Sequence, residues 1–245
     1  MVFLESNRIE TFIMIGLTEF ELAALILSLK VSVTSVLISL PLGLGASWLL
    51  ARSNFPGKRL VDALIHLPLV VPPVVVGYLL LVLLGRSGAF GGWLFETFGI
   101  SLAFTWKGAA IAATVMAFPL MVRSMRLSLE AIDRRLEAAA RTLGATPLRV
   151  FITITLPLMA PGVLAGSILA FARALGEFGA TITFVSNIPG ETQTLPLALY
   201  TLVQSAEGET GALRLALLSI AIALIALMVS EWLARRISST REVSE

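Results

Sequence analysis

Long apolar runs alternate with short polar segments along the whole chain. Residues 31–50 and 63–85 hold no charged side chain, and three later runs are apolar over most of their length. A transmembrane helix needs about 20 predominantly apolar residues. The pattern therefore predicts an all-α integral membrane protein, whose five transmembrane helices cover residues 21–51, 60–85, 106–124, 156–175 and 212–234.

The composition supports a membrane location. Charged residues make up 14% of the chain and apolar residues 57%, and the mean hydropathy is +0.91. Soluble domains average about 25% charged residues, so this chain is too apolar for that class. The net charge of +2, without any basic run, argues against nucleic acid as a partner.

Several kinds of chemistry are excluded by residues that the sequence lacks. There is no cysteine and only one histidine, His66, so disulfides, thiolate metal sites and multi-histidine centres are excluded. Gly57-Lys58 lacks the upstream glycine and the following Ser or Thr of a P-loop, so the chain cannot itself be an ATPase. We therefore expect neither an enzyme nor a cofactor bound by this chain. We interpret His66 as a packed, hydrogen-bonded residue in preference to a proton carrier.

Proline and glycine residues mark special positions within the predicted spans. Pro68, Pro72 and Pro73 interrupt the second span. Either packing sets a kink there, or the helix is opened towards a translocation pathway. Gly162 and Gly166 form a GxxxG pair in the fourth span, which permits close helix contact. For this pair we favour packing within one subunit over a contact between subunits.

Residues 130–155 form a polar, arginine-bearing island between two apolar runs. Residues 138–140 are alanines that favour a helix, Gly144 can end it, and Pro147 can start the next one. The island therefore predicts a short helix, a sharp turn and a second short helix that leads into the span beginning at Leu156. An amphipathic stretch lying on the membrane would also suit the arginines. The Gly144 turn interrupts that periodicity and favours a protrusion held by a partner outside the bilayer.

The basic residues predict the orientation of the chain. Twelve of the 18 lysines and arginines lie in the loop after the first span, in the polar island together with Arg123 and Arg126 just before it, and in the C-terminal segment. With five spans these three segments share one side, which the positive-inside rule makes cytoplasmic. We therefore expect a multi-pass protein of the cell (inner or plasma) membrane. Its N-terminal leader (1–20) and the loop 176–211 are then exterior, and its C-terminal tail (237–245) is cytoplasmic.

The two long outer connections differ in character. Residues 176–211 carry four glutamates and no basic residue. Within them, the uncharged piece 192–206, broken by Pro196, is interpreted as a re-entrant or short surface helix. Residues 86–107 are rich in glycine and aromatic residues, which are typical of a membrane interface.

The polar island also carries a spaced motif. Gly144 is followed after nine residues by Ile154-Thr155-Leu156-Pro157, with Ala139-Ala140 shortly before it. This arrangement resembles the EAA loop of ABC-transporter permease subunits, a cytoplasmic coupling helix that docks on the ATPase subunit. The family's glutamate stands six residues before the glycine, where this chain has Ala138. Either Glu137 substitutes for it from the neighbouring position, or no glutamate is needed there. The resemblance implies that ATPase coupling involves Glu137, Ala138, Ala139, Gly144, Ala145, Thr146, Pro147, Ile154, Leu156 and Pro157.

Further stretches of sequence make the resemblance to one group of this family specific. They read FPGK, HLPLVVPPVVVGYLLL, FPLMVR, ALGEFGATITFVSNIPGET and SEWLAR, at residues 55–58, 66–81, 118–123, 174–192 and 230–235. With the island, they resemble the molybdate permeases of that family over roughly residues 20–236. The resemblance implies a type I ABC importer permease bundle with a coupling helix-loop-helix, assembled in the membrane lipid as a homodimer. It also implies two cytoplasmic ATPase subunits, which bind ATP and Mg²⁺, and an extracytoplasmic molybdate-binding protein. Close relatives carry tungstate, sulfate or thiosulfate, which are the alternative substrates.

The translocation path is expected to bind its ion weakly, because the ion must leave again. Hydroxyl and amide side chains of the exterior loop, with Ser101 across from it, are candidates for a gate or for contact with the binding protein. Local turn and cap chemistry is the alternative. Arg173 and Glu177 stand four residues apart, and we favour an interfacial ion pair over a role for Arg173 in meeting the anion. The predicted path and gate residues are Pro72, Pro73, Arg173, Glu177, Thr181, Thr183, Ser186 and Asn187.

Overall fold

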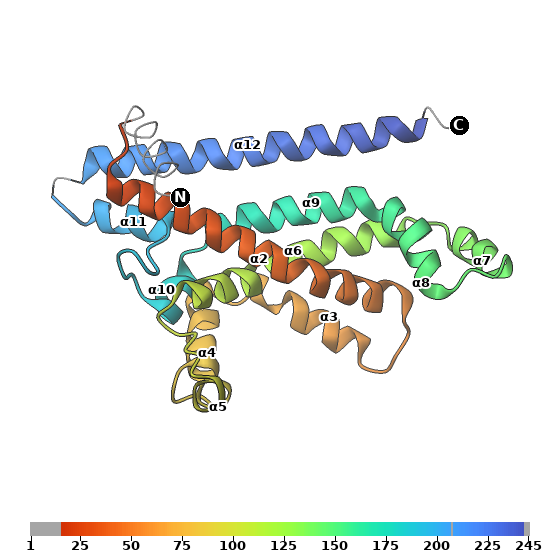
Figure 1. Cartoon of the computed structure of the whole chain (residues 1–245), viewed down its shortest axis with the longest axis horizontal. Coiled ribbons are helices and arrows are strands. Elements are labelled where there is room, and N and C mark those ends of the chain that lie inside the picture. Colours follow the sequence, from red (N-terminus) through yellow and green to blue (C-terminus); the bar gives the residue numbers. More distant parts are fainter. Residues whose placement is uncertain (1–15, 207, 243–245) are drawn as a thin grey trace. The chain divides into compact units, whose positions relative to one another are not determined.

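The computed structural model describes residues 16–206 and 208–242, and all regular structure in these ranges is helical, as the sequence predicts. A 3₁₀ turn occupies Leu67–Leu69 and a π-helical stretch occupies Phe151–Thr155. The α-helices, shown in Figure 1, are α2 (Glu19–Arg52), α3 (Lys58–His66), α4 (Pro73–Leu84), α5 (Ala89–Phe98), α6 (Trp106–Glu130), α7 (Arg134–Thr142), α8 (Pro147–Val150), α9 (Leu156–Leu175), α10 (Gly179–Val185), α11 (Leu195–Val203) and α12 (Glu209–Glu242).

Four helices in the described part are long and apolar enough to cross a membrane. They are α2, α6, the continuous helix Pro147–Leu175, and the Glu209–Val229 part of α12. The second predicted span is present as two helices, α3 with its 3₁₀ turn and α4, with a break between Leu69 and Pro73. Proline donates no backbone hydrogen bond and disfavours helix at the preceding residue, which accounts for this break. The chain has five spans if the broken pair crosses the membrane as one.

The chain forms two compact units. The first comprises the described residues up to Ser32, with Pro73–Ala112 and Leu175–Ile222. The second comprises Val33–Pro72, Ala113–Ala174 and the chain from Ala223 onward. Helices α2, α6 and α12 contribute residues to both units.

Close packing of α6 against α9 builds the core of the second unit. The contact depends on the missing side chain of Gly162, where a Cβ would lie 2.2 Å from Ser128 Cβ. Ser124 Oγ donates a hydrogen bond of 3.0 Å to the Gly162 carbonyl oxygen, which adds a polar link between the helices. The two helices lie side by side in Figure 1. The predicted use of the GxxxG pair within one subunit is confirmed.

Helix α10 packs on α4 in the first unit, again through glycine. A Cβ on Gly77 would lie 2.5 Å from the Ala180 carbonyl oxygen, and one on Gly179 would lie 2.7 Å from Pro73 Cβ. Side chains larger than hydrogen at these positions would separate the two helices. The start of α4 is therefore fixed against the start of α10.

Polar contacts tie α2 to two later helices of the first unit. The Leu195 N–H at the start of α11 donates to Ser28 Oγ at 2.6 Å. The N-terminus of α2 is a capping box, in which the Thr18 N–H donates to Glu21 Oε2 at 2.7 Å and the Glu21 N–H donates to Thr18 Oγ1 at 3.3 Å. The buried Glu21 also pairs with Arg214 of α12 at 3.1 Å.

One further helix agrees with the prediction, and other elements depart from it. The helix expected within residues 192–206 is present as α11, and Leu195 is buried there. Helices α5 and α10, inside the two outer connections, were not predicted. Helix α12 continues to Glu242, so residues 237–242 of the predicted tail are helical. Residues 1–15 of the predicted leader and residues 243–245 of the tail lie outside the described residues.

Candidate functional site

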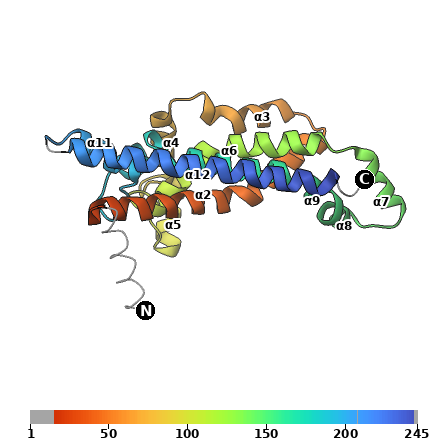
Figure 2. The ribbon, with the colours of Figure 1, turned by 90° about the horizontal axis from the view of Figure 1, so that it is seen from above.

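The coupling segment, residues 134–155, consists of α7, a sharp turn, α8 and the π-helical stretch that continues into α9. The Asp133 carboxylate caps α7 by accepting the Arg135 N–H at 2.9 Å, and Thr146 Oγ1 caps α8 by accepting the Arg149 N–H at 3.4 Å. Gly144 adopts φ +85°, a left-handed conformation that glycine takes without steric cost. The predicted helix, turn and helix are confirmed, and both ribbon views show them beyond the ends of α6 and α9 (Figures 1 and 2).

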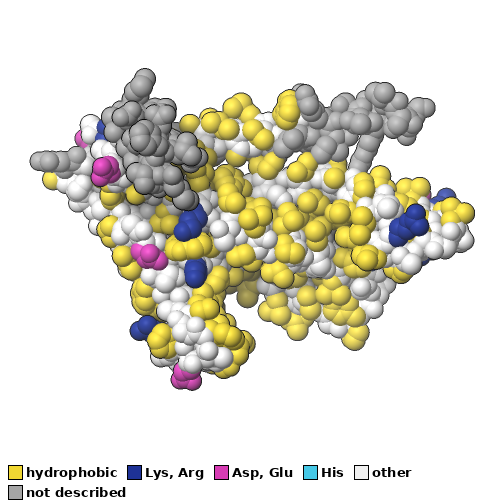
Figure 3. Space-filling view, viewed as in Figure 1, with side chains coloured by type: hydrophobic (Ala, Val, Ile, Leu, Met, Phe, Trp, Pro, Cys, Tyr) yellow, Lys and Arg dark blue, Asp and Glu magenta, His cyan; other side chains and the backbone are white. Residues whose placement is uncertain are grey.

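The outer surface of the coupling segment is apolar at its centre and basic around it. Leu143 is 88% exposed and Leu148 is 68% exposed, one on each side of the turn, and Leu136 and Ile152 are also exposed. Basic side chains gather over α7 and α8 in the space-filling view (Figure 3). The exposed arginines of these two helices are at positions 134, 135, 141 and 149. Apolar side chains presented together on a polar loop are typical of a surface that binds another protein.

Glu137 faces the opposite way, into the chain. Its carboxylate pairs with Arg52 at the end of α2, with Nη2 to Oε1 3.0 Å apart, and both side chains are only 9% exposed. The same Oε1 accepts a hydrogen bond of 2.9 Å from the buried Thr155 hydroxyl, just before α9. Glu137 therefore links α7 to the end of α2 and to the start of α9. Its role in this structure is to position the coupling segment from within.

Two further contacts strengthen this link. Arg134 Nη2 donates to the Ala51 carbonyl oxygen at 3.1 Å, and the Trp48 and Phe151 rings meet edge to face with centroids 5.3 Å apart. A hollow of about 280 Å³ lies among the side chains of this region, including those of Arg52 and Arg134. One ion pair and two hydrogen bonds therefore join α7 to the end of α2 and to the start of α9, and the ring contact joins α2 to the π-helical stretch.

The remaining predicted coupling residues fall on different sides of the segment. Exposed positions are occupied by Ala138, Ala139, Gly144, Thr146, Pro147 and Pro157, whereas Ala145, Ile154 and Leu156 are half-buried. Their contact with an ATPase subunit stays a prediction.

The predicted gate residues near the end of α10 bond to their own loop. Asn187 Nδ2 donates to Thr201 Oγ1 at 2.8 Å, and Gln193 Nε2 donates to Asn187 Oδ1 at 2.9 Å. Ser186, at φ +65°, accepts the Thr192 hydroxyl at its carbonyl oxygen at 3.2 Å. These bonds lie within the turn between α10 and α11 or join it to Thr201 of α11. Local turn chemistry of this kind is the alternative that the sequence left open for these residues.

The other predicted path residues have mixed surroundings. Thr181 is buried in α10, and the Thr183 hydroxyl donates to the Gly179 carbonyl oxygen at 2.9 Å. Glu177 is only 3% exposed, and its Oε1 accepts the Ala180 N–H at 2.8 Å at the start of α10. Glu177 is therefore not a surface carboxylate, and its predicted ion pair with Arg173 stays a prediction.

Pro72 lies exposed in the break before α4, whereas Pro73 contacts α10 as described above. Ser101 is half-buried, and its hydroxyl lies 3.5 Å from the Ala103 carbonyl oxygen.

His66 is hydrogen-bonded, as predicted. Its Nδ1 lies 2.8 Å from the Asp62 carbonyl oxygen, one turn earlier in α3.

Two structural features were missed by the reading of the sequence. Arg52 was counted only as a basic loop residue, although it is the partner of Glu137. A column of fully buried serines also runs along α2, at residues 28, 32, 35, 39 and 47. Their spacing of three, four or eight residues places them on one helix face, and this periodicity was present in the sequence.

The family model for the inner membrane component of binding-protein-dependent transport systems matches residues 39–239 of this chain. The chain belongs to this family. It is a multi-pass inner membrane permease subunit without an ATP site, and ATP hydrolysis is the task of a separate subunit.

Relatives of this permease differ in their sequence identity to it and in the length over which they match. The molybdenum transport system permease protein ModB of Escherichia coli (strain K12) is 64% identical over 219 residues, which cover 89% of this chain and 96% of that protein. The sulfate transport system permease protein CysW of Synechocystis sp. is 40% identical over 174 residues, which cover 69% of this chain and 63% of that protein. Similarity is therefore higher and more extensive to the molybdenum permease.

Solved structures share the permease fold. The MetNI methionine ABC transporter, solved in inward-facing conformations, matches with a TM-score of 0.69 over 90% of this chain and 99% of that chain. At 17% identity this match concerns the fold alone.

Proposed function

We propose that this chain is the permease subunit of an ATP-driven importer for molybdate. The observation that carries the proposal is the high identity to a molybdenum permease, which extends over nearly the full length of both proteins. The sulfate permease matches less of this chain at lower identity, so sulfate and related oxyanions are the less favoured substrates.

A cytoplasmic ATPase subunit is the proposed partner of the coupling segment. The exposed Leu143 and Leu148 would enter an apolar groove, and the surrounding arginines would meet acidic groups at its rim. Apolar anchors with a charged rim are the usual composition of a specific protein interface. ATP and Mg²⁺ would be bound by that partner, because this chain carries no P-loop.

The contacts of Glu137 support a mechanism for coupling. When two ATPase subunits close on ATP, each would displace a docked α7. The Arg52 ion pair and the Thr155 hydrogen bond would carry that displacement to α2 and α9. Moving these helices would alternate access to the pathway between the two sides of the membrane.

The complete importer would contain two copies of this chain and an extracytoplasmic binding protein. The distribution of arginines and lysines supports an exterior N-terminus and a cytoplasmic C-terminus. The binding protein would then deliver molybdate to the exterior loop, near Ser186 and Asn187. Large exposed apolar side chains along α2 and α12 support contact with membrane lipid.

Uptake of radiolabelled molybdate tests the proposal. The chain would be expressed with its own ATPase and binding protein in cells that lack a molybdate importer, with or without a hundredfold excess of sulfate. We expect uptake that depends on this chain and is unaffected by sulfate. Loss of molybdate uptake in the presence of sulfate, or uptake of sulfate alone, would overturn the substrate assignment.

The coupling surface is tested in the same cells by copurification of the ATPase subunit. Leu143→Asp should abolish copurification, because a charge would replace the most exposed leucine of the segment. Asn54→Asp, which places the same charge on the exposed loop between α2 and α3, serves as the matched control. Equal copurification with both variants would exclude this surface as the docking site.

A further inference from the structure

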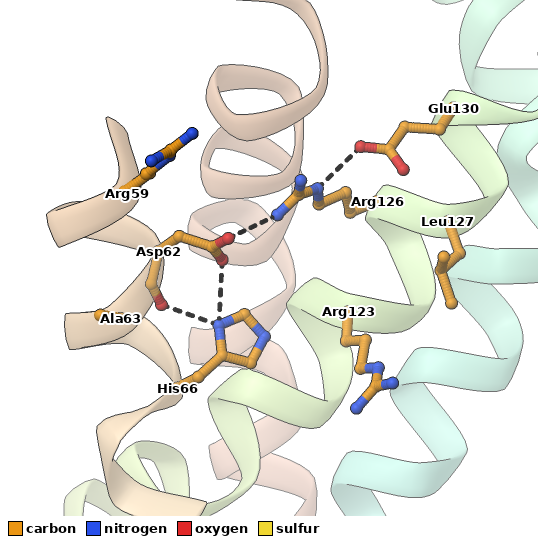
Figure 4. Close-up of a pocket in the computed structure, with 8 residues that line it drawn as sticks. All are labelled: Arg59, Asp62, Ala63, His66, Arg123, Arg126, Leu127 and Glu130. Carbon is orange, nitrogen blue, oxygen red and sulfur yellow. Dashed lines mark hydrogen bonds and ion pairs between the residues drawn. The ribbon is translucent and has the colours of Figure 1, made fainter. Parts of the chain in front are cut away.

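An open cavity of about 490 Å³ lies between α3 and α6 in the second unit. Its polar lining comes from Arg59, Asp62 and His66 of α3 and from Arg123, Arg126 and Glu130 of α6 (Figure 4). Neither the coupling surface nor the predicted gate includes these residues.

The two carboxylates of the cavity are both held by one arginine. Arg126 Nε donates to Glu130 Oε1 at 2.8 Å, and Arg126 Nη1 donates to Asp62 Oδ2 at 2.9 Å. His66 Nδ1 lies 2.8 Å from the Asp62 carbonyl oxygen and 3.1 Å from Asp62 Oδ1. Since both neighbours of Nδ1 are acceptors, the ring proton belongs on Nδ1, and the donors left for a ligand are those of the arginines.

Positive charge remains after this pairing. The side chains of Arg59 and Arg123 make no hydrogen bond and no ion pair within the described ranges of the chain. In Figure 4 the Arg123 guanidinium group is directed away from the His66 ring, and Arg59 lies beyond Asp62 on α3, on the other side of the Arg126 network. Three guanidinium groups against two carboxylates leave the cavity with a net charge of +1 while His66 is neutral. The composition suits an anion with several oxygen acceptors, such as a phosphate group.

The cavity also has an apolar wall, because Leu127 of α6 lines it and is exposed. Helix α3 is amphipathic, and charged residues of one face line the cavity while Leu60 and Leu64 are exposed on its other face. A ligand that fits both features has an anionic oxygen-rich head and apolar chains. Basic pockets between membrane helices at the cytoplasmic surface bind lipid headgroups of this kind.

We propose that this cavity binds the phosphate group of an anionic phospholipid, whose acyl chains lie along Leu127. The proposal rests on the orientation given under the proposed function, which places the cavity at the cytoplasmic surface of the membrane. Free phosphate and molybdate share the tetrahedral oxyanion chemistry but have no chains to cover this leucine. The bound lipid would bridge α3 and α6 shortly before the coupling segment begins, since α6 ends at Glu130 and α7 begins at Arg134.

Lipid binding to the purified permease tests the proposal, with phosphatidylglycerol and phosphatidylcholine as the probes. Native mass spectrometry would compare the wild type with Arg59→Gln/Arg123→Gln, which removes the two arginines that have no partner in the cavity. Arg86→Gln/Lys107→Gln removes the same charge outside it and serves as the control. We expect the wild type and the control to retain phosphatidylglycerol over phosphatidylcholine, and the cavity variant to bind it at least tenfold more weakly. Arg59→Lys/Arg123→Lys should restore part of the binding, which separates loss of charge from misfolding.

Two outcomes would overturn the proposal. One is equal retention of phosphatidylglycerol by the wild type and a correctly folded cavity variant. The other is displacement of the lipid by millimolar phosphate or molybdate, which would assign the cavity to a free oxyanion. Neither outcome depends on molybdate transport, because the measurement uses neither the ATPase nor the binding protein. A failure of the proposed substrate would leave this result unchanged.

Discussion

Glu137→Gln is the substitution that most directly probes how the coupling segment is positioned. The glutamine keeps an oxygen that can accept the Thr155 hydroxyl but removes the charge that pairs with Arg52. Arg52 is then left as a buried guanidinium without its counterion. The change therefore isolates the ion pair from the hydrogen bond and from side-chain size.

The magnitude follows from the burial of the pair. Removing one partner of a buried ion pair costs about 3–5 kcal/mol. The hollow beside Arg52 and Glu137 admits water, and each side chain keeps 9% exposure, which favours the lower end of that range. A cost of about 3 kcal/mol corresponds to roughly a hundredfold increase in local opening, at about 1.4 kcal/mol per factor of ten.

Hydrogen exchange of the backbone amides of α7 measures this opening in lipid nanodiscs. We expect the backbone amides of Arg134–Thr142 to exchange roughly a hundredfold faster in Glu137→Gln, because loss of the ion pair costs about 3 kcal/mol. Amides in the middle of α6 should keep their wild-type rates. Glu96→Gln, the same change at an exposed glutamate of α5, is the matched control. Combining Glu137→Gln with Arg52→Met leaves no buried charge, so the double variant should exchange more slowly than Glu137→Gln alone.

Two results would refute this reasoning. Wild-type exchange of α7 in Glu137→Gln would mean that the ion pair does not hold the helix in place. Faster exchange in the double variant than in the single one would mean that the stranded charge of Arg52 is not the cause.

Three further substitutions test the local structure. Gly144→Val should abolish copurification of the ATPase, because valine cannot adopt φ +85° without a cost of about 1–2 kcal/mol or more, whereas Gly144→Asn should retain it; loss with both would point away from the backbone conformation. Gly162→Ala should lower the melting temperature through the clash with Ser128, whereas Gly45→Ala, where a new Cβ meets nothing, should not; equal melting temperatures would contradict the packing argument. Asp133→Ala should speed amide exchange in α7 about fivefold, since losing such a cap costs about 1 kcal/mol, and unchanged exchange would show that the cap is not needed.

Local composition was sufficient to predict the coupling segment. Alanines at 138–140, Gly144 and Pro147 determine a helix, a turn and a helix through their own backbone preferences, and the structure has these elements in place. The close helix contact could likewise be predicted from the GxxxG pair within one helix, because only a missing side chain allows α6 to lie so close to α9.

Long-range partners could not be predicted in this way. The inward direction of Glu137 depends on Arg52, which lies 85 residues earlier in the chain. Nothing near Glu137 in sequence indicates that pairing, so the residue was grouped with the docking surface. The arginine cavity between α3 and α6 was missed for the same reason, since Arg126 and Asp62 are 64 residues apart.

Short helices in the outer connections were missed for a different reason. Helices α5 and α10 span 10 and 7 residues, too few for a clear period, and their sequences contain glycine or β-branched residues. Their packing on α4 selects the helical state instead, and that contact is visible only in the folded chain.

The central claim is that this permease couples an ATPase partner to molybdate import. The most direct test reconstitutes the chain with its ATPase and binding protein in liposomes and measures ATP hydrolysis with molybdate or sulfate present. The account predicts stimulation by the molybdate-loaded binding protein, no stimulation by sulfate, and loss of stimulation in Leu143→Asp. Stimulation by sulfate alone, or a rate of ATP hydrolysis that does not depend on the loaded binding protein, would contradict this prediction.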